Sequence, residues 1–597
     1  MKRHLTSIAV LALCASSLTA CDDETGNQVQ DAGVPSADSA QQIDVLASDV
    51  TLANDATPPP PVDSAVPTPS VTFDVESRTF LEPFQLTLST ATPELRIAYT
   101  LDGSTPGDSS AIYTEPITIE ETTWLRAREV GPAASEEIVD RWYIAVAPRL
   151  ANFQSNLPLV VIDSWSRDID AESNGERPYR PIHIMSLAAA AGERTALVGA
   201  PVDHVSHGAM HVRGSSTSRY PKKQYRLELR QADGDDQDST LLGLPEEADW
   251  VLQAPYGDKS LMRNVLMYRW SNAIGRYAAR TRYVELFFAH HGGRVGASED
   301  DYRGVYVVTE RLERDKNRID VETLDEEDSA EPEVSGGYVL KRDWVDGGPD
   351  DLLTTEVYDD VLTWVYPKPA ALTAAQRLWM TDYINRFERA ISGPSYADPE
   401  SGYAAFIDVD SFIDHHLLVE MARNVDGFVL STHMFKSRGG KLNMGPIWDY
   451  NGALGNADYF QAWQPQGWHH QFDEGPGGER FPADNPNGYH WYCRLFVDPV
   501  FRERYAARWR ELRETALSTA RLTETIQETA SRLSEAADRN FERWPILGEG
   551  IFPDNAHVSM TEATYASEIE YLETWLSARV AWMDDAVGQL EAPDCSR

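Results

Sequence analysis

The chain has few cysteines, an excess of acidic over basic residues and a single long hydrophobic run. Its 597 residues include four cysteines and no Cys-x-x-Cys pair, which argues against a disulfide-dense scaffold and the usual zinc frameworks. Lysine and arginine number 53 against 94 aspartates and glutamates, a net charge of −41. Because phosphate backbones and anionic lipids attract basic surfaces, this balance argues against nucleic acid and lipid surfaces as partners.

Several familiar catalytic motifs are also missing. The sequence has no Gly-x-Ser-x-Gly elbow, no His-Glu-x-x-His pair, no Walker lysine loop and no Gly-x-Gly-x-x-Gly fingerprint. The histidines do cluster, but their spacing does not predict ligands that converge on a metal, and we expect them in loops or on the surface. These histidines are His204, His207, His211, His415, His416, His469 and His470.

The hydrophobic run belongs to an N-terminal leader. Basic residues at Lys2 and Arg3 precede the apolar stretch from Ile8 to Ala15, which is too short to span a bilayer and predicts a signal peptide over residues 1–20. The leader ends in Leu-Thr-Ala followed by Cys21, which resembles a bacterial lipobox. That resemblance implies a lipidated Cys21 and an extracytoplasmic protein of the cell envelope, held at the membrane only by its lipid anchor. Cys493 and Cys595 can pair in such a compartment, and the sequence leaves this open.

Residues 21–70 have the composition of a linker. They are rich in Asp, Ala, Ser, Pro and Thr, include four consecutive prolines at 58–61 and have almost no aromatic residues. Such a segment cannot bury enough apolar surface to order itself, and its prolines stiffen it. We expect a disordered spacer.

Residues 71–147 predict a small all-β sandwich. Short alternating runs occur at Phe84–Leu88, Leu95–Thr100, Ile117–Ile119 and Trp124–Arg128, with turn residues after the second. The segment Tyr-Thr-Leu-Asp-Gly-Ser-Thr-Pro at 99–106 and Trp-Leu-Arg-Ala at 124–127 resemble the chitobiase/hexosaminidase C-terminal type of module. Its aromatic residues serve either as core or as a platform for a glycan, so a glycan is a candidate partner.

The remaining chain mixes strand-like and helical patterns and predicts an α+β domain over residues 155–590 with a helical C-terminal part. Strand-like runs are Tyr283–Phe288, Gly304–Val308 and Tyr338–Leu340. Helical patterns are Ser260–Ile274, with Asp258 as a candidate cap, then Phe412–Ala422, Phe501–Ala537 and Tyr565–Val587.

Two aspartates carry the main chemical hypothesis. Asp426 follows an apolar helix, and Asp449 comes 23 residues later, after what the pattern predicts to be one hairpin beginning at Thr432–Lys436. That arrangement would bring two carboxylates into one cleft. Phosphoryl transfer uses such a pair, one to orient the nucleophile and one to hold Mg²⁺. The alternative is that Asp426-Gly427 only forms a turn.

Eight short blocks of sequence stand out along this domain: Arg-Gly-Ser-Ser at 213–216, Pro-Lys-Lys-Gln-Tyr-Arg-Leu at 221–227, Leu-Met-Arg-Asn at 261–264, Tyr-Arg-Gly-Val-Tyr at 302–306, Asp-Lys-Asn-Arg at 315–318, Gly-Gly-Tyr-Val-Leu-Lys at 336–341, Asn-Val-Asp-Gly at 424–427 and Gly-Pro-Ile-Trp-Asp at 445–449. They occur in the order typical of the CotH kinase family, which the chain resembles over about residues 155–590.

The resemblance implies a diverged protein-kinase-like fold that uses ATP with Mg²⁺ or Mn²⁺. By it, Asp426 takes the role of the catalytic aspartate, and Asp449 and Asn451 take the metal-binding role. Asn451 stands where many members of the family have a further aspartate, which puts a second metal in doubt. The resemblance also suggests residues near the nucleotide or its phosphates: Lys222, Lys223, Arg263, Glu310 and Lys341.

The function implied is that of an atypical secreted protein kinase. It would transfer the γ-phosphate of ATP to Ser or Thr of extracytoplasmic proteins or to itself. The alternative is a non-catalytic envelope protein, for adhesion or structure, that uses the same fold and associates with carbohydrate.

Overall fold

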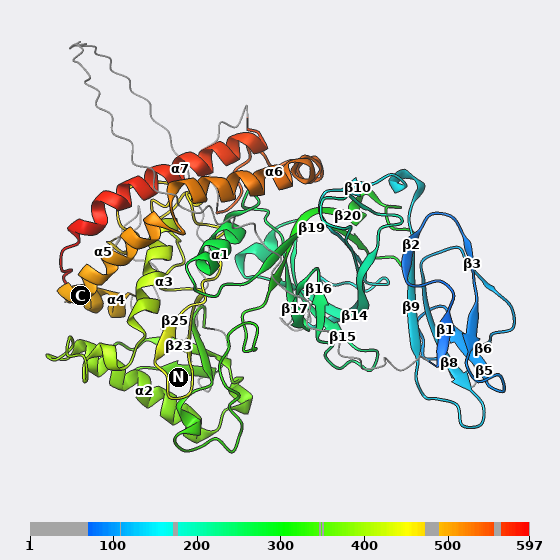
Figure 1. Cartoon of the computed structure of the whole chain (residues 1–597), viewed down its shortest axis with the longest axis horizontal. Helices are drawn as coiled ribbons and strands as arrows, with labels where there is room; N and C mark the ends of the chain where they lie inside the picture. The colour runs from blue at the N-terminus through cyan, green and yellow to red at the C-terminus, as the bar shows by residue number, and fades with distance from the viewer. Residues whose placement is uncertain are drawn as a thin grey trace, which may run out of the picture. The chain divides into compact units, whose positions relative to one another are not determined.

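A computed structural model describes residues 70–595 apart from 108, 171–176, 346–347, 349–350, 472–488 and 554–562. The predicted signal peptide, Cys21 and the predicted linker up to residue 69 lie outside the described residues. Within the described part the chain forms a β-rich module, a closed barrel, a second sheet and a helical C-terminal part (Figure 1).

The β-rich module is built from short strands around a small core. Its largest sheet has the order β2-β9-β8-β5-β6, and two further antiparallel pairs are β1 with β4 and β3 with β7. In β7 the two isoleucines are buried and Thr118 is exposed, as the alternating pattern predicts. The strands are β1 (Val71–Phe73), β2 (Arg78–Phe80), β3 (Phe84–Leu86), β4 (Leu88–Thr90), β5 (Arg96–Thr100), β6 (Ala111–Ile112), β7 (Ile117–Ile119), β8 (Thr123–Val130) and β9 (Val139–Ala145).

The predicted turn after β5 has the expected chemistry. Asp102 Oδ1 accepts a hydrogen bond from the Ser104 backbone N–H at 3.0 Å. Gly103 adopts a φ of +76°, and a Cβ there would overlap the Trp124 ring. This position therefore requires glycine for two reasons, its conformation and the close approach of the indole.

A closed barrel follows, with the strand order β11-β12-β14-β15-β18-β20-β19. Strand β11 closes it by pairing in parallel with β19, and the other neighbours are antiparallel. Buried apolar side chains, among them Ile162, Leu227 and Trp250, fill one core cluster. The strands are β11 (Leu159–Asp163), β12 (Arg180–Leu187), β14 (Val202–Arg213), β15 (Gln224–Arg230), β18 (Asp249–Gln253), β19 (Thr281–Ala289) and β20 (Tyr302–Glu310).

Two small strand pairs accompany the barrel. They are β10 (Gln154–Ser155) with β13 (Thr195–Ala196), and β16 (Ser239–Leu241) with β17 (Leu244–Glu247).

The second sheet has the order β22-β23-β21-β24-β25 and is antiparallel throughout. Its last two strands form the hairpin predicted between the two aspartates. The strands are β21 (Tyr338–Arg342), β22 (Leu352–Thr354), β23 (Val361–Tyr366), β24 (Thr432–Lys436) and β25 (Leu442–Met444).

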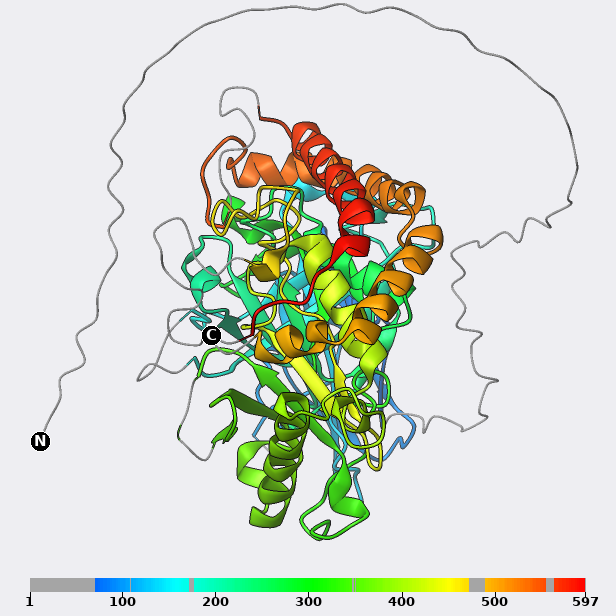
Figure 2. The same cartoon turned by 90° about the vertical axis from the view of Figure 1, so that its left-hand side faces the viewer.

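Four of the described helices, α2, α3, α5 and α7, begin after a residue whose side chain accepts from a free backbone N–H group. Thr373 forms a capping box with Gln376, and Asp408 accepts from the Ser411 N–H. Figure 2 shows α6 and α7 side by side, in accord with their many contacts. The helices are α1 (Arg263–Ala273), α2 (Ala374–Ser392), α3 (Val409–Ala422), α4 (His490–Val497), α5 (Pro499–Glu514), α6 (Thr519–Arg543) and α7 (Tyr565–Ala586).

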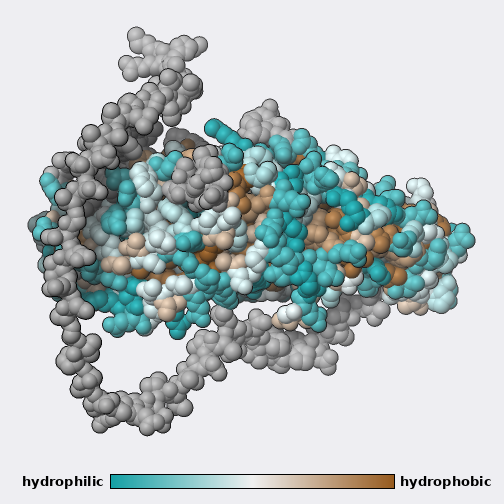
Figure 3. Space-filling model, turned by 90° about the horizontal axis from the view of Figure 1, so that it is seen from above, coloured by the Kyte–Doolittle hydropathy of each residue, from teal (hydrophilic) through white to brown (hydrophobic). Residues whose placement is uncertain are grey.

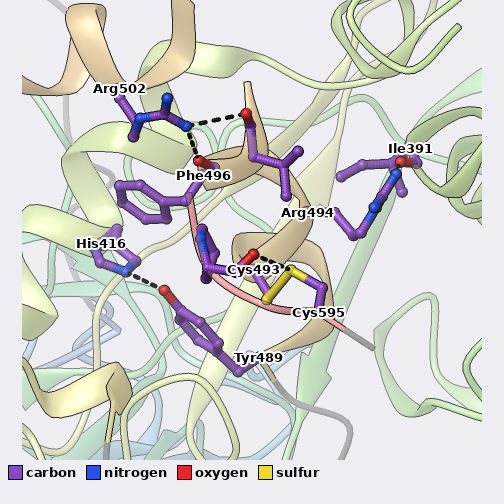
Figure 4. Close-up of a disulfide and its surroundings, with 10 residues drawn as sticks. Ile391, His416, Tyr489, Cys493, Arg494, Phe496, Arg502 and Cys595 are labelled. Atoms are coloured by element: carbon purple, nitrogen blue, oxygen red, sulfur yellow. Dashed lines mark hydrogen bonds between the residues drawn. A yellow bond between two sulfur atoms is a disulfide. The ribbon is translucent and has the colours of Figure 1, made fainter. Parts of the chain in front are cut away.

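A disulfide joins the two cysteines whose pairing the sequence left open. Cys493 in α4 is bonded to Cys595, and their Cα atoms are 5.9 Å apart (Figure 4). Because the two cysteines are 102 residues apart, the bond fixes the end of the chain, beyond α7, to α4.

Comparison with the sequence-based expectations confirms the β-rich module and the helical C-terminal part. The pattern over Phe501–Ala537 is two helices, α5 and α6. Helix α1 begins at Arg263 rather than Ser260, because the Asp258 carboxylate accepts from the N–H groups of both Ser260 and Arg263. The closed barrel is an addition that the patterns did not predict.

Among the described helices, none has the length and apolar character needed to cross a bilayer. Seen from above, the described residues present mainly hydrophilic surface with smaller hydrophobic areas between (Figure 3). This agrees with the strongly acidic composition.

Candidate functional site

The segments that carry Asp426 and Asp449 are tied together by one side chain. Helix α3 ends at Ala422, Arg423 turns the backbone with a φ of +46°, and Asn424 follows. The Asn424 Oδ1 accepts from the Asp426 N–H at 3.3 Å, and its Nδ2 donates to the Asp449 carbonyl, also at 3.3 Å. The predicted hairpin therefore does return the chain so that the backbones of the two aspartates meet at one asparagine.

The two carboxylates also interact electrostatically, and a third joins them. Burial, Asp449 and Asp343 together raise the pKa of Asp426 from 3.8 to about 7. Burial and Asp343 raise the pKa of Asp449 as well, while Arg213 opposes that rise. Because neighbouring like charges raise a pKa, these shifts indicate that the carboxyl groups of Asp343, Asp426 and Asp449 lie near one another.

Asp343 lies just beyond the end of β21 and was not singled out in the sequence. Its Oδ2 accepts from the Lys341 ammonium group at 2.6 Å. We refer to Asp343, Asp426 and Asp449 as the acidic cluster. Lys341, which was predicted to lie near the phosphates, is therefore bonded directly to a member of this cluster.

Arg213 is the second residue that sequence reasoning missed. It ends β14, and its guanidinium lies 5.7 Å from the centre of the Trp448 ring. Burial lowers its pKa, and Asp449 opposes that change, so this cation faces the acidic cluster from the barrel side. Arg213 lies in the Arg-Gly-Ser-Ser block that resembles the CotH family, but the phosphate-binding role was predicted for the nearby Lys222 and Lys223 instead.

An aromatic pair supports Asp449. Tyr268 of α1 stacks on Trp448 with ring centres 5.7 Å apart, and the Tyr268 hydroxyl accepts from the Asp449 N–H at 3.3 Å. Asp449 has a φ of +61°, in the left-handed region that aspartate enters more readily than most residues. These contacts hold Asp449 in a conformation that an unsupported loop would rarely keep.

The other predicted phosphate ligands have protein partners. The ammonium group of buried Lys222 donates to the Val305 carbonyl at 2.6 Å and to Asn540 Oδ1 at 2.7 Å, and Lys223 donates to the Ser218 carbonyl at 2.7 Å.

Arg263 and Glu310 are each in an ion pair. Arg263 pairs with Asp258 at 2.6 Å in the interior, and Glu310 at the end of β20 pairs with Arg280 at 2.6 Å. The phosphate or nucleotide role suggested for these two residues and for Lys222 and Lys223 stays a prediction, as does that of Asn451, which is half-buried two residues after Asp449.

The expectation that the histidines lie in loops or on the surface is wrong for several of them. His415 and His416 are buried in α3, and His469 is buried too. His416, Glu420 and His470 place candidate ligand atoms within 4.8 Å of one another. The sequence spacing did not reveal this cluster, because α3 brings His416 and Glu420 to one face and His470 lies in a short 3-10 helix, His469–Gln471, 50 residues after Glu420.

This histidine cluster does not fit a metal ion. The two ring nitrogens of His416 hydrogen-bond to the hydroxyls of Tyr505 at 3.0 Å and Tyr489 at 3.1 Å, the latter drawn in Figure 4. Glu420 bonds to His470 at 2.6 Å and to Arg579 at 3.1 Å. A buried cation already neutralises the carboxylate, so the cluster is a satisfied polar network in the core.

Comparison with known proteins identifies two regions. A family model described as chitobiase/beta-hexosaminidase C-terminal domain matches residues 75–140. A family model described as CotH kinase protein matches residues 210–583. A search of curated proteins finds no match. The second match spans well over half of the chain and includes the acidic cluster, Arg213 and Asn424, and the chain therefore belongs to the CotH kinase protein family.

Proposed function

We propose that this protein is an atypical protein kinase that transfers the γ-phosphate of ATP to Ser or Thr hydroxyls of extracytoplasmic proteins or of itself. The observation that carries the proposal is the convergence of Asp426, Asp449 and Asp343 on one site, with Arg213 facing them. Membership of the CotH kinase family supports the same class of reaction and a kinase-like organisation of the domain.

Asp426 suits the role of proton acceptor. General bases work best when their pKa lies near the operating pH, and burial and two neighbouring carboxylates raise the pKa of Asp426 to about 7. In this role the carboxylate would orient the hydroxyl of the substrate and accept its proton as the oxygen attacks phosphorus.

Asp449 and Asp343 have the chemistry of a divalent cation site. Carboxylate oxygens are the ligands that Mg²⁺ and Mn²⁺ prefer, and Asn451 could add an amide oxygen. Burial and, after it, the charges of neighbouring carboxylates, Asp343 among them, raise the pKa values of Asp426 and Asp449, so a divalent cation would relieve the repulsion between the carboxylates. When bound, such an ion would neutralise phosphate charge.

Arg213 is the best-placed group for a phosphate. Its guanidinium is planar and permanently charged, which suits bidentate contact with phosphate oxygens. It faces Asp449, so phosphates held between the two would meet a cation on one side and the carboxylates' metal on the other. Lys341, paired with Asp343, is a second candidate on the same side as the acidic cluster.

Incubation of the purified chain with γ-labelled ATP and Mg²⁺ or Mn²⁺ tests the proposal. We expect label on the chain itself or on an added protein acceptor. Asp426→Asn and Asp449→Ala should each lower incorporation by a factor of about 10² or more. Asp538→Asn, on the exposed face of α6, is the control and should transfer normally. Nucleotide binding by the wild-type chain with no incorporation would instead support a non-catalytic envelope protein.

We also propose that the mature protein is a lipoprotein of the cell envelope, anchored through Cys21. The leader ending in Leu-Thr-Ala-Cys supports this. Metabolic labelling with palmitate in a bacterial host should mark the wild-type protein and leave Cys21→Ser unlabelled. Equal labelling of both would contradict the anchor.

A further inference from the structure

Two exposed aromatic side chains stand out on the described surface. Among the described residues, Trp344 and Phe552 are the two tryptophan or phenylalanine side chains that remain mostly exposed, at 57% and 53%. Val345, beside Trp344, is 54% exposed. Single exposed apolar residues are common on proteins and need no explanation, but these three lie on two segments that border the acidic cluster.

Trp344 directly follows a member of the acidic cluster. Strand β21 ends at Arg342, Asp343 comes next, and the Trp344 backbone N–H donates to Asp343 Oδ1 at 2.9 Å. The other oxygen of Asp343 accepts from Lys341 at 2.6 Å. Both oxygens of this carboxylate are therefore bonded to its own segment, which fixes where the loop with Trp344 leaves the cluster.

The segment with Phe552 packs against the loops that carry the other two aspartates. Gly452 follows Asp449 by three residues, and a Cβ there would lie 3.7 Å from Pro553. The same Cβ would lie 3.2 Å from Val425, the residue before the remaining aspartate. Because Phe552 adjoins Pro553, its backbone passes beside both loops.

Stacking holds the Phe552 ring near the site. The ring lies parallel to that of Tyr459, with the centres 5.7 Å apart and 4° between the planes. Burial raises the pKa of Tyr459, and the charges of Asp426 and Asp449 raise it further, so the tyrosine lies near the acidic cluster. The Tyr220 hydroxyl donates to the Phe552 carbonyl and anchors the backbone. Phe552 thus has one face on a neighbour of the cluster and the rest of its ring in solvent.

The proposed reaction places a polypeptide at this surface. A serine or threonine hydroxyl has to reach Asp426, so the chain on either side of it lies close to the acidic cluster. An extended polypeptide advances about 3.4 Å per residue, so residues within about three positions of the hydroxyl lie within about 10 Å of it. Exposed aromatic residues are the side chains that most often anchor a partner at protein interfaces. The chain therefore presents apolar contact surface where the acceptor must lie.

The charges around the cluster oppose an acidic acceptor. Asp458, next to Tyr459, is exposed, and the chain has a net charge of −41. Like charges brought together at an interface cost binding free energy, so aspartate or glutamate close to the acceptor hydroxyl would be disfavoured. An anionic lipid surface is disfavoured for the same reason, which favours a polypeptide as the occupant.

We propose that Trp344, Val345 and Phe552 form the docking surface for the acceptor polypeptide, and that they select serine or threonine residues with large apolar side chains nearby and no acidic ones. This inference rests on the proposed phosphate transfer and names the class of its substrate. The docking residues supply contact area to the acceptor and take no part in binding the nucleotide or its cation.

Three synthetic peptides that each contain one serine test this selection. In a background of glycine and glutamine, the first has leucine two and three positions before the serine and phenylalanine two and three positions after it. The second has glycine at these four positions, and the third has glutamate. With γ-labelled ATP and Mn²⁺, kcat/KM of the full mature chain should be at least about tenfold higher for the apolar peptide than for the glycine peptide, and lowest for the glutamate peptide. Equal values for the three peptides would overturn the proposal.

Variants of the docking surface give the second measurement. Trp344→Ser and Phe552→Ser should each raise KM for the apolar peptide about three- to tenfold and leave Mn²⁺ binding in the presence of ATP unchanged. Leu378→Ser is the matched control, because it removes a side chain of α2 that is 72% exposed, and it should behave as the wild type does. An unchanged KM in both docking variants would contradict the inference.

Peptide binding without nucleotide separates this inference from the proposed function. Fluorescence anisotropy of the labelled peptides should give the same ranking, with weaker binding of the apolar peptide by both docking variants. That ranking without phosphate transfer to any acceptor would keep the docking surface and refute the kinase, and transfer without any ranking would do the reverse. Sedimentation of the wild type, but not of the docking variants, with phosphatidylglycerol vesicles, together with unchanged peptide kinetics, would assign these residues to a lipid surface and overturn the proposal.

Discussion

Replacing Asp426 with asparagine should stabilise the nucleotide-free protein above neutral pH. The pKa of Asp426 rises from 3.8 to about 7 on folding, because burial and the charges of Asp449 and Asp343 disfavour its ionised form. A carboxyl whose pKa is raised in the folded state costs stability as pH rises, from about 4 until pH exceeds the folded value. The full cost above pH 7 is at most about 4 kcal/mol, and asparagine avoids it.

Urea unfolding followed by tryptophan fluorescence measures this effect. At pH 8, without nucleotide or divalent cation, Asp426→Asn should be more stable than wild type by about 2–4 kcal/mol. At pH 5 the difference should fall to less than half, because the folded protein then keeps its proton. Asp538→Asn, exposed on α6, should show no pH-dependent difference. Lower stability of Asp426→Asn at pH 8, or a difference independent of pH, would refute the claim that the three carboxylates crowd one site.

Three further perturbations probe the rest of the structure. Cys493→Ser should lower the free energy of unfolding by about 2–5 kcal/mol, and a reductant should bring wild type to the same value in a urea titration; unchanged stability would argue against the disulfide. Arg579→Leu leaves Glu420 with a buried charge and should cost about 3–5 kcal/mol by the same measurement, whereas a neutral effect would mean that the pair is dispensable. Asn424→Ala removes the side chain that ties Asp426 to Asp449, so it should lower kcat for phosphate transfer about tenfold or more and leave KM for ATP little changed. Asn424→Asp should not restore kcat, because aspartate lacks the N–H that reaches the Asp449 carbonyl.

The sequence predicted the local features of the site better than its long-range partners. The pairing of Asp426 with Asp449 was predictable because Asp426 directly follows an apolar segment with a helical period, and a single hairpin separates the two aspartates. Arg213 and Asp343 were missed because they approach Asp426 and Asp449 from the end of β14 and from just beyond β21, far away along the chain. Only the tertiary fold decides that their strand ends meet.

Barrel closure was unpredictable for a related reason. It depends on β11 pairing in parallel with β19, more than a hundred residues later, and no local pattern encodes that register. The location of the histidines was mispredicted because burial depends on the tertiary fold. His415 and His416 fit the helical period of α3, but histidine side chains were expected to face solvent. Their tyrosine partners are Tyr492 in α4, Tyr505 in α5 and Tyr489, the residue just before α4.

The central claim, that Asp449 and its neighbours form a site for a nucleotide with its divalent cation, is tested most directly by Mn²⁺ binding. Electron paramagnetic resonance can count Mn²⁺ bound to the mature chain in the presence of ATP. We expect wild type and Asp426→Asn to bind Mn²⁺ with ATP, and Asp449→Asn to bind about tenfold more weakly or worse. Undiminished Mn²⁺ binding by Asp449→Asn, or none by wild type, would contradict the account.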